Sequence, residues 1–202
     1  CIADEGEEDE RVADELRPTQ FMAHDYGVFP IDCTFHSNTY KPGSHEFQIG
    51  ATFNFRTEAY QKIYFMDRTK YTALRTQEEE PLTYYGIEDA EPETIYTNGP
   101  IMIGISLRDN LIQLDQKETQ LMLGVTFTNN WNGEVTSVDS VRITFPSAVH
   151  LDGNCSGEYR FTCAGTDPIE CTLIDEIPPF KKRQTLRCPI RIAESDIDNV
   201  LG

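Results

Sequence analysis

Hydrophobic and polar side chains alternate along two neighbouring runs in the second half of the chain. Leu121, Leu123, Val125 and Phe127 form the first run, and Val141, Ile143 and Phe145 form the second. A period of two places alternate side chains on one face of a β-strand. Between the runs lies Asn132-Gly133, a residue pair that favours tight turns. The pattern therefore predicts two strands and a sharp reversal over residues 120–146.

The parity of the two runs is inconsistent with a simple hairpin. If Asn132 and Gly133 formed a two-residue loop, Val125 would face Ser140, so an apolar residue would lie opposite a polar one. Either a β-bulge lies between Val138 and Val141, or the turn arches between two different sheets. We favour the arch, which predicts a β-sandwich.

The same reasoning predicts an all-β protein of two β-sandwich domains after an acidic tether. Further alternating runs predict strands at residues 31–35, 46–56, 60–66, 82–85, 101–107, 111–114, 159–163, 171–174 and 186–192. Asp67 is a suitable N-cap for one short helix that ends near Gln77. Asn98-Gly99-Pro100 interrupts the pattern. The predicted parts are a tether over 1–17, an N-terminal β domain over 18–99 and a β-sandwich domain over 100–202.

Charge and cysteine content restrict the setting. The 202 residues include 34 acidic and 17 basic ones, for a net charge of −17, which repels nucleic acid. No apolar run is long enough to span a membrane. Six cysteines, four of them between Cys155 and Cys188, suit an oxidising compartment better than a cytosol.

The first seventeen residues contain eight Asp or Glu residues and few apolar ones. Such a segment buries too little surface to offset its ordering entropy, so we interpret it as a solvated tether. An N-terminal cysteine followed by an acidic tether resembles a processed prokaryotic lipoprotein. This resemblance implies that Cys1 carries a lipid and that the protein is extracellular, at the cell surface.

A second resemblance involves residues 124–146, GVTFTNNWNGEVTSVDSVRITFP. A strand that ends in Asn, a turn with Gly and a V-x-I-x-F-P strand together resemble the immunoglobulin-like modules of prokaryotic surface proteins. The resemblance implies an immunoglobulin-like sandwich in an extracellular setting, whereas function differs between such modules. Trp131, the single tryptophan, lies in the turn rather than in the core position found in antibodies.

No motif predicts catalysis, a cofactor or a metal site. The histidines His24, His36, His45 and His150 are scattered, although His36 and His45 flank a turn. Nucleophile and phosphate-loop motifs do not occur. Acidic runs at residues 88–91 and 196–199 supply oxygen ligands but not the spacing of a calcium loop, so we interpret them as solvated loops.

The four clustered cysteines predict two disulfides. Cys155 and Cys163 bracket a glycine-bearing segment, and Cys171 and Cys188 each lie in a strand-like run, so we expect Cys155 to bond with Cys163 and Cys171 with Cys188. A Cys163–Cys171 bond is an open alternative. If Cys1 is lipidated, Cys33 is left as a small buried hydrophobe. Asn154-Cys155-Ser156 matches a glycosylation acceptor, but the central cysteine disfavours its use.

These features predict a non-catalytic, lipid-anchored extracellular protein that acts as a binding or scaffold module. Its expected partners are other surface proteins or copies of itself, with membrane attachment through the lipid alone and no nucleic acid. One alternative is a subunit of an extracellular filament or sheath, in which an extended N-terminal segment pairs with the sheet edge of a neighbour. Another alternative is an accessory domain of a surface enzyme.

Overall fold

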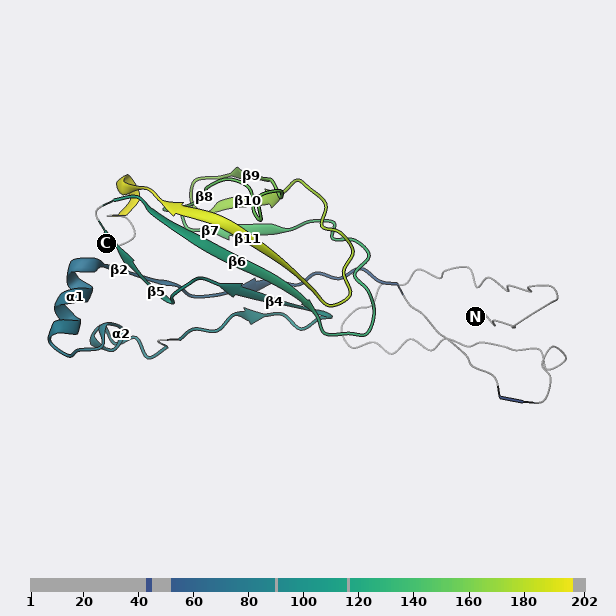
Figure 1. The fold of residues 1–202 in the computed structure, drawn as a ribbon, viewed down its shortest axis with the longest axis horizontal. Helices are drawn as coiled ribbons and strands as arrows, with labels where there is room; N and C mark the ends of the chain where they lie inside the picture. Colours follow the sequence, from purple (N-terminus) through teal and green to yellow (C-terminus); the bar gives the residue numbers. More distant parts are fainter. Residues whose placement is uncertain (1–42, 45–51, 90, 116, 198–202) are drawn as a thin grey trace. The chain divides into compact units, whose positions relative to one another are not determined.

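The computed structural model describes residues 43–44, 52–89, 91–115 and 117–197. The chain divides into two compact units, Cys1–Asn54 and Phe55–Gly202. The second unit contains every helix and strand described below (Figure 1). The predicted tether, the predicted strand at 31–35 and most of the run at 46–56 lie outside the described residues.

The second unit is mostly β. Its helices are α1 (Arg68–Thr76), α2 (Pro81–Tyr84) and a 3₁₀ turn, η2 (Glu194–Asp196). Its strands are β1 (Ala59–Tyr60), β2 (Tyr64–Asp67), β3 (Ile95–Tyr96), β4 (Ile101–Ser106), β5 (Leu111–Leu114), β6 (Thr119–Asn129), β7 (Arg142–Phe145), β8 (Val149–Leu151), β9 (Phe161–Ala164), β10 (Ile169–Leu173) and β11 (Arg183–Ile192).

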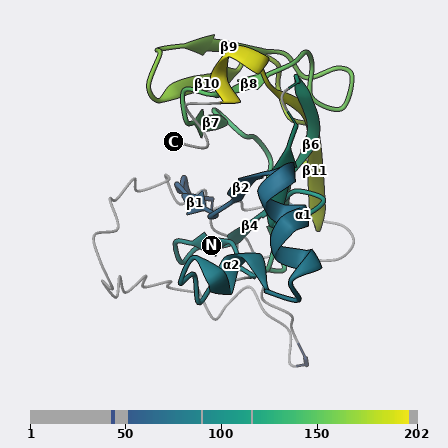
Figure 2. The ribbon, with the colours of Figure 1, turned by 90° about the vertical axis from the view of Figure 1, so that its left-hand side faces the viewer.

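Two sheets enclose the main core. One has the order β4-β6-β11-β8 and the other β7-β10-β9, and the second lies against one side of the first (Figures 1 and 2). β6 and β7 are therefore in different sheets, which confirms the arch predicted from their parity. Asn129 orders the start of the arch, because its amide donates hydrogen bonds to the carbonyls of Gly133 and Lys181 at 2.8 and 3.0 Å.

The antiparallel pair β6–β11 forms the centre of the core. Its register places Leu186 opposite Val125 and Cys188 opposite Leu123. All four side chains are buried, and Phe145 and Ile169 of the other sheet belong to the same apolar cluster. Strict alternation along both strands thus gives the larger sheet an apolar inner face, which contacts the core, and an outer face, which points away from it.

Strands from both sides of the predicted domain boundary pair with each other. β2 is parallel to β5, with Tyr64 opposite Leu111. Ile112 and Leu114 of β5 belong to the main core, and Phe65 of β2 packs against it. The boundary predicted at Pro100 therefore falls inside one compact unit. The interruption of the hydrophobic pattern at Asn98-Gly99-Pro100 corresponds to the short connection between β3 and β4.

Local sequence signals succeeded for one helix and failed for the other. Asp67 caps α1 by accepting a hydrogen bond from the Lys70 N–H at 3.0 Å, which confirms the predicted helix. The strand predicted at 82–85 is wrong, because the residues form α2. Pro81 occupies the start of that helix, where its fixed φ and missing N–H are tolerated.

Two other expectations also differ from the structure. Phe53 and Phe55, at the described end of the run 46–56, are not in a strand and are 50% and 44% exposed. The strand order also departs from the immunoglobulin order, in which the last strand pairs with the one before it. Here β11 lies between β6 and β8, while β10 pairs with β7 and β9.

Candidate functional site

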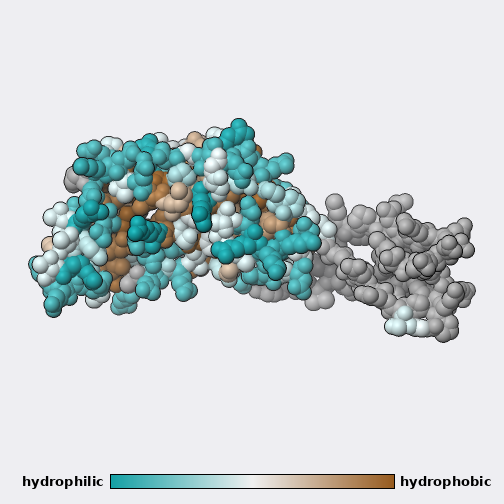
Figure 3. Space-filling model, in the orientation of Figure 1, coloured by the Kyte–Doolittle hydropathy of each residue, from teal (hydrophilic) through white to brown (hydrophobic). Residues whose placement is uncertain are grey.

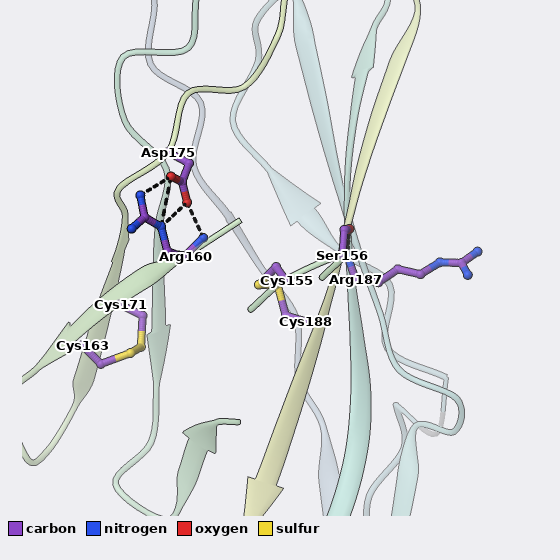
Figure 4. The surroundings of a disulfide bond; sticks show 8 residues. All are labelled: Cys155, Ser156, Arg160, Cys163, Cys171, Asp175, Arg187 and Cys188. Atoms are coloured by element: carbon purple, nitrogen blue, oxygen red, sulfur yellow. Dashed lines mark hydrogen bonds and ion pairs between the residues drawn. A yellow bond between two sulfur atoms is a disulfide. The ribbon is translucent and has the colours of Figure 1, made fainter. Parts of the chain in front are cut away.

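The two disulfides join different partners from those that the sequence pattern favoured. Cys155 bonds to Cys188, and Cys163 bonds to Cys171 (Figure 4). Cys163 and Cys171 are directly opposite each other in the β9–β10 register, whereas β10 and β11 belong to different sheets. The preferred pairing was therefore wrong, and the open alternative, Cys163–Cys171, is the one observed.

The Cys155–Cys188 bond attaches a loop to the edge of β11. Ser156 accepts a hydrogen bond from the Arg187 N–H through its hydroxyl at 3.0 Å, and its own N–H donates to the Arg187 carbonyl at 2.6 Å. The loop thus continues the edge pairing that β8 begins at Ile190–Ile192. Backbone groups of β11 that would face solvent are satisfied.

The open end of the β9–β10 hairpin is held by an ion pair. Arg160 donates to Asp175 from Nη2 at 2.7 Å, from Nε at 3.2 Å and from its backbone N–H at 2.6 Å (Figure 4). These hydrogen bonds lower the pKa of the Asp175 carboxyl. Together with Cys163–Cys171 near the turn, they hold the hairpin at both ends.

Apart from Met102, the outer face of the four-stranded sheet carries small residues along β4 and the adjoining half of β6. Gly104, Gly124, Thr126 and Thr128 alternate with the inward-facing residues of these strands. A Cβ at Gly124 would lie 2.5 Å from Ser106 Oγ, so a larger residue here would force the Ser106 hydroxyl to move. The result is a flat shelf beside β11.

Three arginines, Arg183, Arg187 and Arg191, line β11 on this outer face; we call them the arginine row. They alternate with the buried residues Leu186, Cys188, Ile190 and Ile192. Figure 4 shows Arg187 extending away from the sheet on the side opposite the Cys155–Cys188 bond.

The members of the arginine row differ in their ion pairs. Arg191 lies 3.8 Å from Glu118 and 3.7 Å from Asp152. Within the described ranges, Arg183 and Arg187 are exposed and have no carboxylate within 4.0 Å. The row therefore presents two uncompensated positive charges beside the shelf.

A groove of about 580 Å³ lies between β5 and β6. Its apolar lining comes from three strands: Leu111, Ile112, Leu121, Met122, Pro189 and Ile190. In the orientation of Figure 1, hydrophobic surface is visible over β5 and is hollowed beside β6 (Figure 3). Arg68, Arg108, Asp109 and Asp152 supply charged groups at the groove.

Part of the β6 backbone is unpaired on the groove side. The Pro189 carbonyl accepts a hydrogen bond from the Asp152 N–H at 2.8 Å, so it points away from β6. Because antiparallel pairs alternate, its register partner Met122 points its backbone groups away from β11. β4 ends at Ser106, so among the described strands none pairs with Met122 on that side.

The described histidine and the two acidic runs do not come together. His150 Nε2 lies 3.3 Å from Asp196 Oδ2, and Lys62 Nζ lies 3.8 Å from Asp89 Oδ2. Among the residues that the structure describes, no group of three His, Cys, Asp or Glu residues could hold a metal ion. Cys1, Cys33, His24, His36 and His45 lie outside those residues.

Comparison with known proteins does not identify a family. No protein-family model matches the chain, and no curated protein matches it either. Within the described ranges, the helices are too short to qualify as apolar membrane-spanning segments.

Sequence reasoning missed the arginine row, although a signal was present. The apolar residues of β11 fall at even positions from 186 to 192, and Arg183, Arg187 and Arg191 occupy odd ones. The alternation was used to predict a buried face, and the charges on the opposite face were not considered.

Proposed function

We propose that this chain is an extracellular, lipid-anchored surface protein whose β-sandwich acts as a binding module. The outer face of the four-stranded sheet binds the partner, which is another surface protein or a second copy. The single observation that carries this proposal is the pair of uncompensated arginines, Arg183 and Arg187, on a flat and open sheet face.

The disulfides support the proposed location. Both bonds lie within one sandwich, and disulfides of this kind persist in oxidising compartments. The Cys155–Cys188 bond is fully buried, as is Cys171 of the second bond. The lipid anchor is supported by the sequence resemblance at Cys1, and the intact mass of native, membrane-extracted protein tests it.

The charge distribution supports the choice of face. Most exposed arginines of the described chain are ion-paired, as Arg142 is with Glu170 and Arg160 is with Asp175. Long unpaired side chains on a rigid sheet retain donors for a partner. Charge complementarity would steer association toward this face and fix its orientation.

Site-specific photo-crosslinking in the producing cells tests the proposal. A photoreactive residue replaces Thr185, which lies on the outer face between Arg183 and Arg187. A matched variant places the same residue at the exposed Thr162 on β9, in the other sheet. We expect a discrete crosslinked protein adduct from position 185 and none from position 162.

Two results would count against the proposal. Adducts of equal yield from both positions would indicate nonspecific crowding at the surface. Absence of an adduct at position 185 in cells where the protein is present and folded would remove the outer face as the binding surface.

The groove supports a second candidate function, that of a filament or sheath subunit. An extended segment from a neighbour would add a strand beside Met122, where the β6 backbone is unpaired. Under this second function, electron microscopy at high protein concentration should show filaments of the wild type. The substitution Gln120→Pro removes a backbone N–H and places a proline ring beside this edge, so it should prevent these filaments. A wild-type sample without filaments would exclude this second function.

A further inference from the structure

We infer that the arginine row binds an acidic, extended polypeptide segment of a second copy of this chain. The segment has the composition of residues 1–17, which contain eight Asp or Glu residues. This inference rests on the proposed function in one respect, since both place the partner on the outer face of the four-stranded sheet.

Positive charge is concentrated around the arginine row. The chain has 17 basic residues in total, and five of them fall within the eleven residues from Lys181 to Arg191. Arg183 and Arg187 have no carboxylate partner among the described residues, in a chain with twice as many acids as bases. A concentrated positive surface on an anionic protein is complementary to anionic segments of the same protein.

The spacing of the arginines suits an extended chain. Arginines four residues apart on a strand are separated by about 13 Å, because each residue advances about 3.3 Å. A small anion could contact both Arg183 and Arg187 only if the two side chains leaned toward each other. An extended segment with several carboxylates can contact both, and Gly124 and Thr128, the register partners of these arginines, leave space beside them.

The acidic surroundings of the row favour a short anionic segment. A long polyanion such as a nucleic acid or an anionic polysaccharide would extend beyond the row and meet the rest of a surface with net charge −17. A segment of seventeen residues is of finite length: fully extended it spans about 56 Å against about 26 Å for the row, so it meets less of the surrounding acidic surface than a long polyanion does. Anchoring copies on one membrane would also raise the effective concentration of each segment near its neighbour.

A charge-reversal experiment on the full chain tests the inference. One variant carries Arg183→Glu and Arg187→Glu, and the other carries Glu5→Lys, Glu7→Lys, Glu8→Lys and Asp9→Lys. We expect sedimentation equilibrium to show salt-sensitive self-association of the wild type. Each variant alone should associate about tenfold more weakly, since each exposed ion pair contributes up to about fivefold and at least two pairs are reversed. An equimolar mixture of the two variants should regain association, because the opposite charges then meet between copies.

A control keeps the net charge equal to that of the face variant. Arg75→Glu with Arg142→Glu makes the same charge change on α1 and β7, away from the arginine row. This control should associate as the wild type does. All variants should show native circular dichroism, because the altered described side chains are exposed.

Several results would overturn the inference. The first two are a wild type that stays monomeric and an Arg183→Glu, Arg187→Glu variant that associates as the wild type does. The other two are a control variant whose association weakens equally, and an equimolar mixture that does not regain association. A monomeric wild type that binds dextran sulfate through Arg183 and Arg187 would identify a polysaccharide as the occupant instead. If position 185 still crosslinks to another protein on cells, the proposed function stands and only this inference fails.

Discussion

The two sheets of the sandwich achieve stability in different ways. β6 and β11 pair over ten consecutive positions, and their inner side chains form a continuous apolar ladder. β7, β9 and β10 have only four or five residues each. The smaller sheet relies on the Cys163–Cys171 bond and the Arg160–Asp175 pair. Short strands bury little surface, so specific links supplement packing there.

This difference also separates structural from functional charge. In the smaller sheet the arginines are engaged, because Arg142 contacts Glu170 and Arg160 contacts Asp175. In the larger sheet the backbone ladder and apolar face suffice, so Arg183 and Arg187 are not needed for the fold. The region that is most stably packed is therefore the one that can devote its outer face to binding.

The largest effect should come from breaking the apolar ladder. Leu186 on β11 is fully buried, so Leu186→Ala should lower the free energy of unfolding by about 2 to 5 kcal/mol. Thr185→Ala, one position away on the outer face, should cost much less. Urea denaturation of both variants measures the difference, and equal losses would contradict the assignment of inner and outer faces.

The two disulfides should differ in a way that sharpens the comparison. Their sequence separations are 33 and 8 residues, for which the chain-entropy relation gives about 4 and about 2.5 kcal/mol. Paired Cys→Ala substitutions at 155 and 188 should therefore destabilise more than those at 163 and 171. Thermal unfolding compares them, and non-reducing peptide mapping that recovered Cys155 linked to Cys163 would refute the connectivity.

The smallest effect should come from the ion pair on the hairpin. The pKa of Asp175 is lowered in the folded protein, so its charge adds stability above the unfolded value near 4 and this stability is lost as the pH falls below that. Asp175→Asn retains an acceptor for the Arg160 N–H but not the charge. The variant should unfold more easily than wild type at pH 7, and the gap should close toward pH 2. A gap independent of pH would show that the charge contributes nothing.

Patterns within single elements predicted much of this fold. The parity of Val125 and Val141 predicted the arch between sheets, and Asp67 predicted the start of α1. Both signals are local, because a strand face or an N-cap depends on residues a few positions apart. The strand predicted at 82–85 was wrong because Pro81 is favourable at the first turn of a helix, and that signal was outweighed by the apolar pattern.

Contacts between elements distant in sequence could not be predicted in the same way. The parallel pairing of β2 with β5 crosses a turn that resembled a domain boundary. Cysteine connectivity depends on which strands share a sheet, and spacing alone does not determine that. The groove beside Met122 arises because β4 ends before β6 does, which requires the register of both strands.

Amine footprinting on producing cells tests the central claim, that a partner covers the outer face beside β11. Lys181 and Lys182 directly precede the arginine row, and Lys70 on α1 is an exposed reference in the same chain. An acylating reagent is applied to intact cells and to purified monomer, and mass spectrometry gives the modification of each lysine. The account predicts that Lys181 and Lys182 are protected on cells while Lys70 reacts equally in both samples. Equal reactivity of Lys181 and Lys182 in both samples, or protection confined to Lys70, would contradict it.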